Sequence, residues 1–157
     1  MTQEEMLRLV AANDWLWQQW WPALTGLSPD QARAEVGGSF PSLLATASHM
    51  VSAELTWQAR CDGQHAAPPS AEEGIAALQP SWEALALRRQ AWLEQHSPQT
   101  PVSYTHSGGH STNSVEEIVL HLTSHAHFHR GQLATQFRLL GLKPPSVHFI
   151  TFFRLPG

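Results

Sequence analysis

Apolar residues recur every three or four positions along much of this chain, which is the spacing of one face of an α-helix. The first repeat runs from Met6 to Leu24 and includes Trp17 and Trp20. The stretches between the repeats are rich in Pro, Gly and Ser and predict loops, with only short extended pieces over residues 97–113. Four long helices joined by sizeable loops predict an all-α protein, a four-helix bundle with a short C-terminal segment. The helices are expected at residues 3–24, 41–61, 70–96 and 114–140.

Capping residues mark the ends of these helices. A Ser or Thr followed three residues later by Glu forms a capping box, in which each side chain bonds the backbone N–H of the other residue. Gly63 and Gly141 follow the second and fourth helices, where glycine commonly ends a helix. Pro80 has no backbone N–H, so we expect it to kink or break the third helix. The capping boxes are Thr2 with Glu5, Ser70 with Glu73, and Ser114 with Glu117.

The length and composition indicate one folded domain over residues 1–157. A chain of 157 residues that is 42% hydrophobic and 14% charged can bury a core without disulfides. No apolar run approaches the roughly 20 residues that cross a bilayer, and the N-terminal MTQEEMLRLV carries acids where a signal peptide carries Lys or Arg. We therefore expect a cytoplasmic protein without a membrane partner. The net charge of −4 and the nine scattered Lys and Arg argue against binding to nucleic acid.

The segment HLTSHAHFHRGQL, residues 121–133, places four of the ten histidines within nine positions. On the helical projection His129 lies near the centre of the apolar face, His125 on its flank and His121 at its boundary, whereas His127 points away. Two imidazoles four residues apart on one helical face can bind a single metal ion. The alternative is a pair of neutral core histidines satisfied by hydrogen bonds, because burying unpartnered imidazoles is unfavourable.

A metal site built on two histidines needs a third protein ligand. Cys61 is the only cysteine, which excludes a cysteine-rich cluster and leaves nitrogen and oxygen donors. His49 on the second helix and His96 at the end of the third are the candidates. The apolar residues around His49 fit two different helical faces, one that brings it to the edge of the core and one that turns it outward, so spacing does not decide between them.

The histidine-rich segment resembles the signature of the DinB family, the DinB/YfiT-like group of four-helix metalloproteins related to thiol S-transferases. That signature is a helix that ends in His, three residues and then His-Arg-Gly-Gln. The stretches NDWLWQQW, SLLATASHMVSAELTW and LGLKPPSVHFITFFR are similar to the family's opening helix, first metal-ligand segment and C-terminal cap. The matching residues are His125, His129, Arg130, Gly131 and Gln132 in the signature, and His49, Glu54 and Trp57 upstream.

The resemblance implies a three-histidine metal site, formed by His49, His125 and His129, with coordination positions left open. Such a site accepts Zn, Ni, Fe or Mn, and open positions are typical of reactive rather than structural metal sites. His148 departs from the family pattern, because members commonly carry an acid near that position. This departure puts in question any hydrogen bond that the acid would make to a metal ligand.

The neighbours of the expected ligands have predicted roles of their own. Gln132 falls close to His125 around the helix axis, so we expect it beside the metal ligands or in a substrate pocket. Arg130 is expected to make a structural ion pair or to bind an acidic group of a substrate. Gly131 is expected to let another helix pack closely.

Characterised members of the family imply an enzyme that attaches a low-molecular-weight thiol, such as bacillithiol or mycothiol, to a small electrophilic substrate. A metal-bound thiol needs no protein nucleophile, so Cys61 is expected to be a packing residue. A metal-dependent hydrolase is the second enzymatic hypothesis, with Glu54 as its general base. A metal-binding or stress-response protein without catalytic activity is the hypothesis from another class. Relatives often form homodimers, and we expect an exposed Trp15 and Trp21 to mark such a surface.

Overall fold

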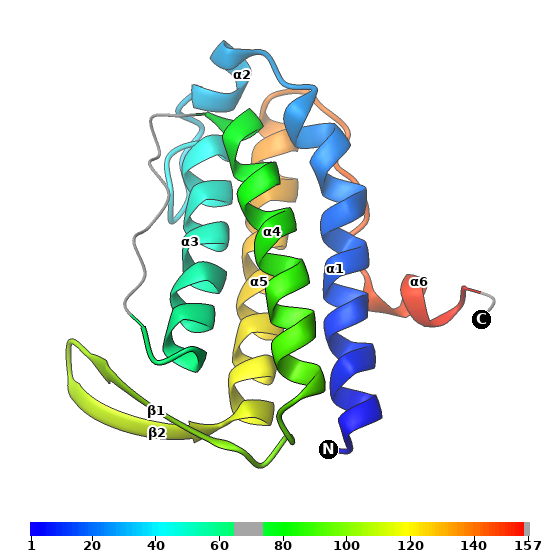
Figure 1. The fold of residues 1–157 in the computed structure, drawn as a ribbon. Helices are drawn as coiled ribbons and strands as arrows, with labels where there is room; N and C mark the ends of the chain where they lie inside the picture. Colours follow the sequence, from blue (N-terminus) through cyan, green and yellow to red (C-terminus); the bar gives the residue numbers. More distant parts are fainter. Residues whose placement is uncertain (65–73, 156–157) are drawn as a thin grey trace.

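The computed structural model of the protein describes residues 1–64 and 74–155, and most of them are helical (Figure 1). The all-α prediction is therefore confirmed in the main, although a two-stranded sheet was not foreseen. The capping box at Ser70 and Glu73 lies outside the described residues. The described part contains α1 (Gln3–Thr25), α2 (Pro29–Arg33), α3 (Leu43–Cys61), α4 (Ile75–Glu94), β1 (Pro101–His106), β2 (Gly109–Ser114), α5 (Val115–Leu139) and α6 (Phe149–Phe153).

Four long helices, α1, α3, α4 and α5, lie side by side, and α3 and α5 run in opposite directions (Figure 1). Their inward faces bury most of the large apolar side chains. Trp17, Trp20 and Leu43 are completely inaccessible to solvent, as is Leu133 on α5. Burial of apolar surface of this extent is the main force that holds such helices together.

The helix ends follow the capping residues. Thr2 and Ser114 each accept the backbone N–H of the glutamate three residues on, and both capping boxes are complete. Gly141 has a φ of 72°, and the N–H of Leu142 donates to the carbonyl of Phe137 at 2.9 Å, which closes α5 with a left-handed turn. Of the two effects predicted for Pro80, a kink or a break, the break does not occur, because α4 continues through this residue. Pro80 lies in the second turn, where its missing N–H costs the helix a single hydrogen bond.

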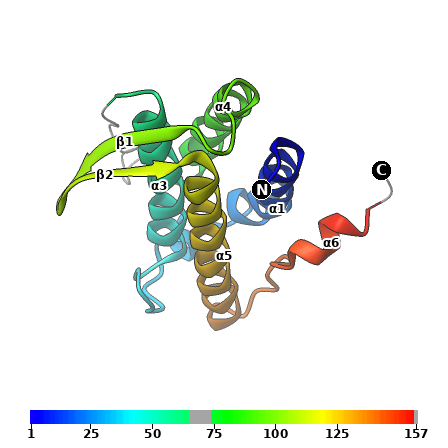
Figure 2. The same ribbon diagram turned by 90° about the horizontal axis from the view of Figure 1, so that it is seen from below.

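A β-hairpin forms in the region, residues 97–113, that was predicted to be loop with short extended pieces. β1 and β2 pair antiparallel from Pro101 opposite Ser114 to His106 opposite Gly109, and Gly109 has a φ of 123°. The hairpin contacts α3 through β1 and α5 through β2. Seen from below, it extends across the ends of these two helices (Figure 2).

The short α6 lies on the opposite side of the molecule from the hairpin and packs against α1 (Figure 2). Its Phe152 ring lies 6.1 Å from the ring of Trp15, which is half-buried. The prediction of an exposed Trp21 is wrong, because that side chain is only 2% exposed. Trp21 stacks on Trp17 at 4.7 Å and packs against Trp82 of α4, so a second helix covers the face that was expected to be open.

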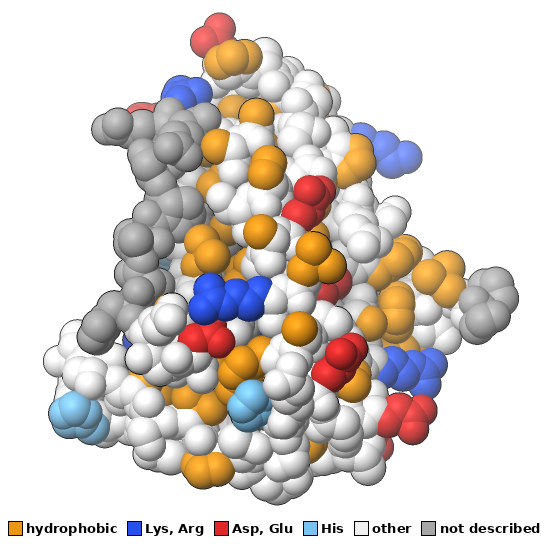
Figure 3. All heavy atoms as spheres, in the orientation of Figure 1, with side chains coloured by type: hydrophobic (Ala, Val, Ile, Leu, Met, Phe, Trp, Pro, Cys, Tyr) orange, Lys and Arg blue, Asp and Glu red, His pale blue; other side chains and the backbone are white. Residues whose placement is uncertain are grey.

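Charged side chains are sparse on the surface. On the face shown in Figure 3 the Lys and Arg side chains are scattered rather than gathered into a patch. None of the helices in the described ranges combines the length and the hydropathy required to span a membrane.

Candidate metal centre

Three histidines meet between α3 and α5. His49 comes from α3, and His125 and His129 come from successive turns of α5; one ring nitrogen from each lies within 4.8 Å of the others. The Nε2 atoms of His49 and His125 are 3.0 Å apart. The structure thus brings together the three residues that the family resemblance implied. His96, the other candidate for the third position, instead stacks on Trp92 at the end of α4.

The burial of these histidines follows the helical projection of α5. His129 is 6% exposed, and His125 and His49 are half-buried. His127 and His121 are exposed. The cluster therefore lies at the edge of the core, with its inner side in the protein and its outer side within reach of small molecules.

Gln132 fixes the orientation of the most buried ring. Its Oε1 lies 2.8 Å from Nδ1 of His129, and its Nε2 donates to Oγ of Ser39 at 2.9 Å. Because the amide oxygen can only accept, Nδ1 of His129 carries the proton and Nε2 keeps its lone pair. Metal-binding histidines characteristically donate their second nitrogen in this way. The expected place of Gln132 beside the ligands agrees with this geometry.

The aromatic ring of Phe40 covers one side of the cluster. It stacks on His49 with ring centroids 4.2 Å apart and lies 5.7 Å from His129. Gln136 holds the backbone around Phe40, because its Nε2 donates to the carbonyls of Phe40 at 2.9 Å and Gly37 at 3.1 Å. Neither residue was identified from the sequence. The signal that could have found Gln136 is a glutamine on the apolar face of α5, where it is 3% exposed.

Two imidazoles of the cluster, those of His125 and His49, have lowered pKa values. Burial, followed by repulsion from His129 and His49, lowers the pKa of His125 to about 4. Burial, and then His129, also lowers the pKa of His49. Neutral imidazoles are the form that binds metal ions, so at pH 7 protons compete weakly for these nitrogens.

Glu54, the proposed general base, is held by side chains of α1 and α4. Its carboxylate accepts hydrogen bonds from the indole N–H of Trp17 at 2.8 Å and of Trp82 at 3.2 Å, and from Arg89 at 2.5 Å. Arg89 also pairs with Asp14 of α1. Glu54 is 3% exposed. Its oxygens accept the hydrogen bonds that link α3 to α1 and α4.

Arg130 likewise points away from the cluster and into the core. It is 0% exposed, and one guanidinium nitrogen donates to the backbone and side-chain oxygens of Asn13 at 3.1 and 2.8 Å. Burial lowers the pKa of Arg130 to about 10. The side chain therefore ties α5 to α1. His148 lies at the start of α6, where its side chain is exposed.

A pocket of about 360 Å³ opens beside Gln132, between α5 and the loop before α3. Gly131 lines this pocket, and a Cβ added there would meet nothing within 4 Å. The prediction that Gly131 allows close helix packing is therefore wrong, because α5 faces open space at that position. The volume falls within the range of small-molecule sites. The lining residues are Val36, Gly37, Gly38, Phe128, Gly131, Gln132, Thr135, Gln136 and Leu139.

The donor set suits a transition-metal cation. Three imidazole nitrogens from two adjacent helices are a ligand type that Zn, Ni, Fe and Mn accept. In the described part of the chain, no other group of His, Cys, Asp or Glu is arranged to hold a metal ion. Fold and site thus define a mostly helical protein with a candidate three-histidine metal centre.

The comparison with protein families gives the same result. The family model of the DinB family matches residues 1–155, and the chain therefore belongs to the DinB family. No curated protein matches the chain.

Proposed function

We propose that this protein is a four-helix bundle that uses a divalent metal ion to transfer a low-molecular-weight thiol to a small electrophile. The observation that carries the proposal is the convergence of His49, His125 and His129, which offers three protein ligands and leaves further coordination positions to small molecules. When bound, a divalent cation lowers the pKa of a thiol and so supplies thiolate at neutral pH.

The residues around the cluster supply binding and orientation. Gln132 orients the ring of His129 through its hydrogen bond to Nδ1. The pocket that Gln132 lines is mainly apolar and suits the body of an electrophilic substrate. In the transfer, the thiol sulfur gives an electron pair to the electrophilic carbon. The thiol proton passes to water, and the leaving group departs with the electrons of the broken bond.

A thiol cosubstrate is favoured over a protein nucleophile. Cys61 is the only cysteine, and burial followed by the charge of Asp62 raises the pKa of its thiol to about 12. A thiol with that pKa is almost entirely protonated at pH 7 and reacts slowly. The hydrolase hypothesis is less favoured, because Glu54 is held by Trp17, Trp82 and Arg89 rather than free to accept a proton from water.

A metal-binding protein without catalytic activity is the second candidate. It is favoured by Phe40, whose ring stacks on His49 and covers that side of the cluster. A covered site suits storage or sensing of a metal, whereas a site that accepts a thiol and an electrophile needs an open side.

Elemental analysis of the untagged protein tests the metal site. We expect about one equivalent of a divalent metal in the wild type and in His127→Ala, which removes an exposed histidine of the same helix, and a loss of the metal in His129→Ala. The absence of metal from the wild type, even after reconstitution with Zn, Ni, Fe and Mn, would overturn both candidates.

A thiol-consumption assay then separates the two candidates. The metal-loaded protein is mixed with bacillithiol, mycothiol or glutathione and the electrophile monochlorobimane. Conjugation above the uncatalysed rate that disappears in His129→Ala supports the transferase. A metal-loaded protein that accelerates none of these reactions supports the metal-binding protein.

A further inference from the structure

Arg60, in the last turn of α3, places its guanidinium against the rings of Trp57 and Tyr104, which contact each other with centroids 4.9 Å apart. The central carbon of the guanidinium lies 4.5 Å from the ring centre of Trp57 and 4.7 Å from that of Tyr104. Cation–π contacts of this kind hold the guanidinium in place without using its N–H groups as hydrogen-bond donors. An arginine held in this way can still receive a planar anion such as a carboxylate.

The charge of Arg60 has no acidic partner in the described residues. The salt bridges there join other groups, and the acid nearest in sequence, Asp62, pairs with Arg88 at 2.7 Å. Asp62 also accepts a hydrogen bond from Gln58. Arg60 thus differs from Arg89, whose charge is balanced by Glu54 and Asp14 inside the core.

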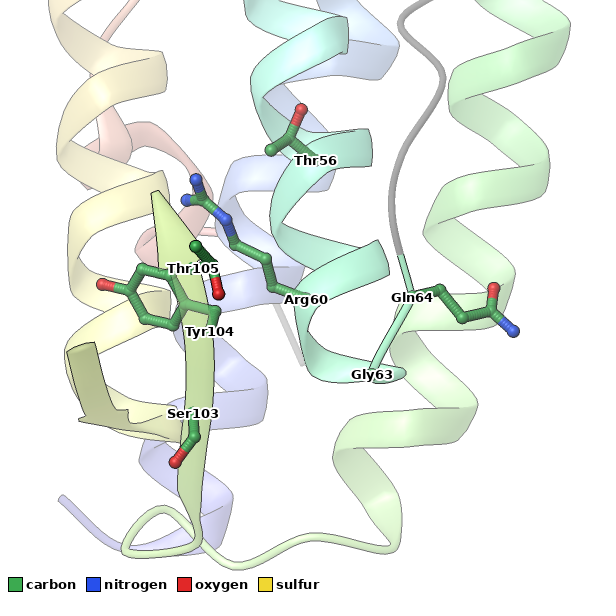
Figure 4. A pocket seen from close by; sticks show the side chains of 7 residues that line it. All are labelled: Thr56, Arg60, Gly63, Gln64, Ser103, Tyr104 and Thr105. Carbon is green, nitrogen blue, oxygen red and sulfur yellow. The ribbon is translucent and has the colours of Figure 1, made fainter. Parts of the chain in front are cut away.

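Arg60 lies in a pocket of about 340 Å³ between the end of α3 and the first strand of the hairpin (Figure 4). In the figure its guanidinium turns back along α3 toward Thr56 and lies close to Tyr104 and Thr105. The hydroxyl groups of Thr56 and Tyr104 already donate to Ser52 and Asn113. Among the described residues that line the pocket, the guanidinium is therefore the strongest free donor for a ligand.

The pocket lies on the same face of α3 as the metal centre. His49, Thr56 and Arg60 are separated by seven and four residues, which places all three within one stripe of the helix. Along the axis, Thr56 lies about 10 Å and Arg60 about 16 Å from His49, at roughly 1.5 Å per residue. Aromatic rings connect the pocket to the cluster. The ring of Trp57 lies 5.3 Å from that of His121, which lies 5.9 Å from that of His125.

We propose that Arg60 binds a carboxylate at the far end of an elongated thiol whose sulfur lies at the three-histidine centre. This inference rests on the proposed function and names the class of cosubstrate, a small thiol that carries an acidic group about 10 to 16 Å from its sulfur. A thiol of that length can reach both the guanidinium of Arg60 and the three-histidine centre at once. A short, uncharged thiol reaches only one of them.

S-methylglutathione is the probe that tests the Arg60 pocket apart from the metal chemistry, because its carboxylates are intact and its sulfur is blocked. Binding is followed by NMR through the Arg60 Nε–H resonance, assigned by its loss in Arg60→Gln, and through the tryptophan indole resonances. We expect Kd to rise at least about tenfold in Arg60→Gln, as for the loss of a charge-assisted bidentate pair. The diethyl ester of the probe should bind the wild type as weakly as the probe itself binds Arg60→Gln.

The control variants separate this inference from the proposed function. Kd for S-methylglutathione should stay unchanged in His129→Ala, which removes a metal ligand, and in Arg138→Gln, an exposed arginine near the other end of α5. Absence of metal from the wild type, with Arg60-dependent binding of the probe retained, overturns the proposed function alone. Equal affinity of the probe and its diethyl ester for the wild type overturns the Arg60 site, and this comparison holds even if Arg60→Gln does not fold.

Discussion

Trp17 on α1 donates its indole N–H to the buried carboxylate of Glu54 on α3 at 2.8 Å. Together with Trp82 and Arg89, this bond makes Glu54 a structural anchor rather than a proton acceptor. We expect Glu54→Gln to lower the free energy of unfolding by about 3 kcal/mol, because Arg89 loses one of its two buried anions. Urea unfolding measures this loss. Glu83→Gln, at an exposed position on α4, should change stability by less than about 0.5 kcal/mol.

The same variant separates a structural from a catalytic role. Glu54→Gln should retain metal binding and thiol conjugation at temperatures where it stays folded. A fully stable Glu54→Gln protein without activity would instead restore Glu54 as a catalytic base.

Gln132→Ala removes the acceptor of the His129 Nδ1–H bond. We expect metal affinity to fall about 10- to 100-fold, as when other hydrogen-bond partners of metal ligands are lost. Competition with a chromogenic chelator measures this change. The matched control is Gln19→Ala, an exposed position on α1; a similar fall in that variant would show that the effect is not specific to His129.

Phe40→Ala opens the side of the cluster that the ring now covers. We expect the metal to transfer to an excess of chelator faster than from the wild type, because water and chelator reach His49 directly. Stopped-flow mixing gives this rate. Phe40→Leu keeps an apolar cover and should release the metal at an intermediate rate. An unchanged rate in both variants would mean that Phe40 does not control access.

The metal-free protein should lose stability in mild acid. The pKa of His125 falls from 6.5 to about 4 on folding, mainly through burial. Between these values the unfolded chain binds more protons than the folded one, so the free energy of unfolding decreases as pH falls from 6.5 toward 4. Allowing for solvent screening of this half-buried ring, the loss from His125 is on the order of 2 kcal/mol.

Urea titrations of chelator-treated protein at several pH values measure this dependence. His125→Gln should flatten it, whereas His127→Gln, which changes an exposed ring, should leave it as in the wild type. A steep acid loss that persists in His125→Gln would assign the effect to other groups.

Cys61→Ala should leave metal content and thiol conjugation unchanged. The pKa of this thiol is raised to about 12 by burial and by Asp62, so the cysteine is a poor nucleophile. We expect iodoacetamide to modify the native protein at pH 7.5 far more slowly than it modifies the urea-unfolded chain, as followed by mass spectrometry. Rapid native alkylation, or loss of activity in Cys61→Ala, would contradict this expectation.

The sequence predicted those features that depend on a single helix. The apolar repeat of α5 placed His129 inside and His127 outside because both positions follow from one axis and one buried face. The sequence did not decide whether His49 faces the core, because two stripes of α3 are apolar. Only the position of α5 shows which of these stripes packs against it. Trp21 was wrongly expected to be exposed for a similar reason, because α4 covers a second face of α1.

Features that join distant segments could not be predicted from local patterns. Gln136 holds the backbone of Phe40 across 96 positions of sequence, and no spacing rule connects the two. The hairpin was missed because its strands are short and mostly polar, so they show little of the alternation that marks a half-buried strand. Ser39 and Gln132 are likewise brought together only by the fold.

His49 and His125 touch in space but are 76 positions apart in sequence. A cation held by both would act as a reversible cross-link across that loop, and the chain-entropy picture gives such a link up to about 4 kcal/mol of stabilisation. The supply of metal would then set the lifetime of this protein as well as its proposed activity. In metal-starved cells the unlinked chain would open more often and be degraded sooner.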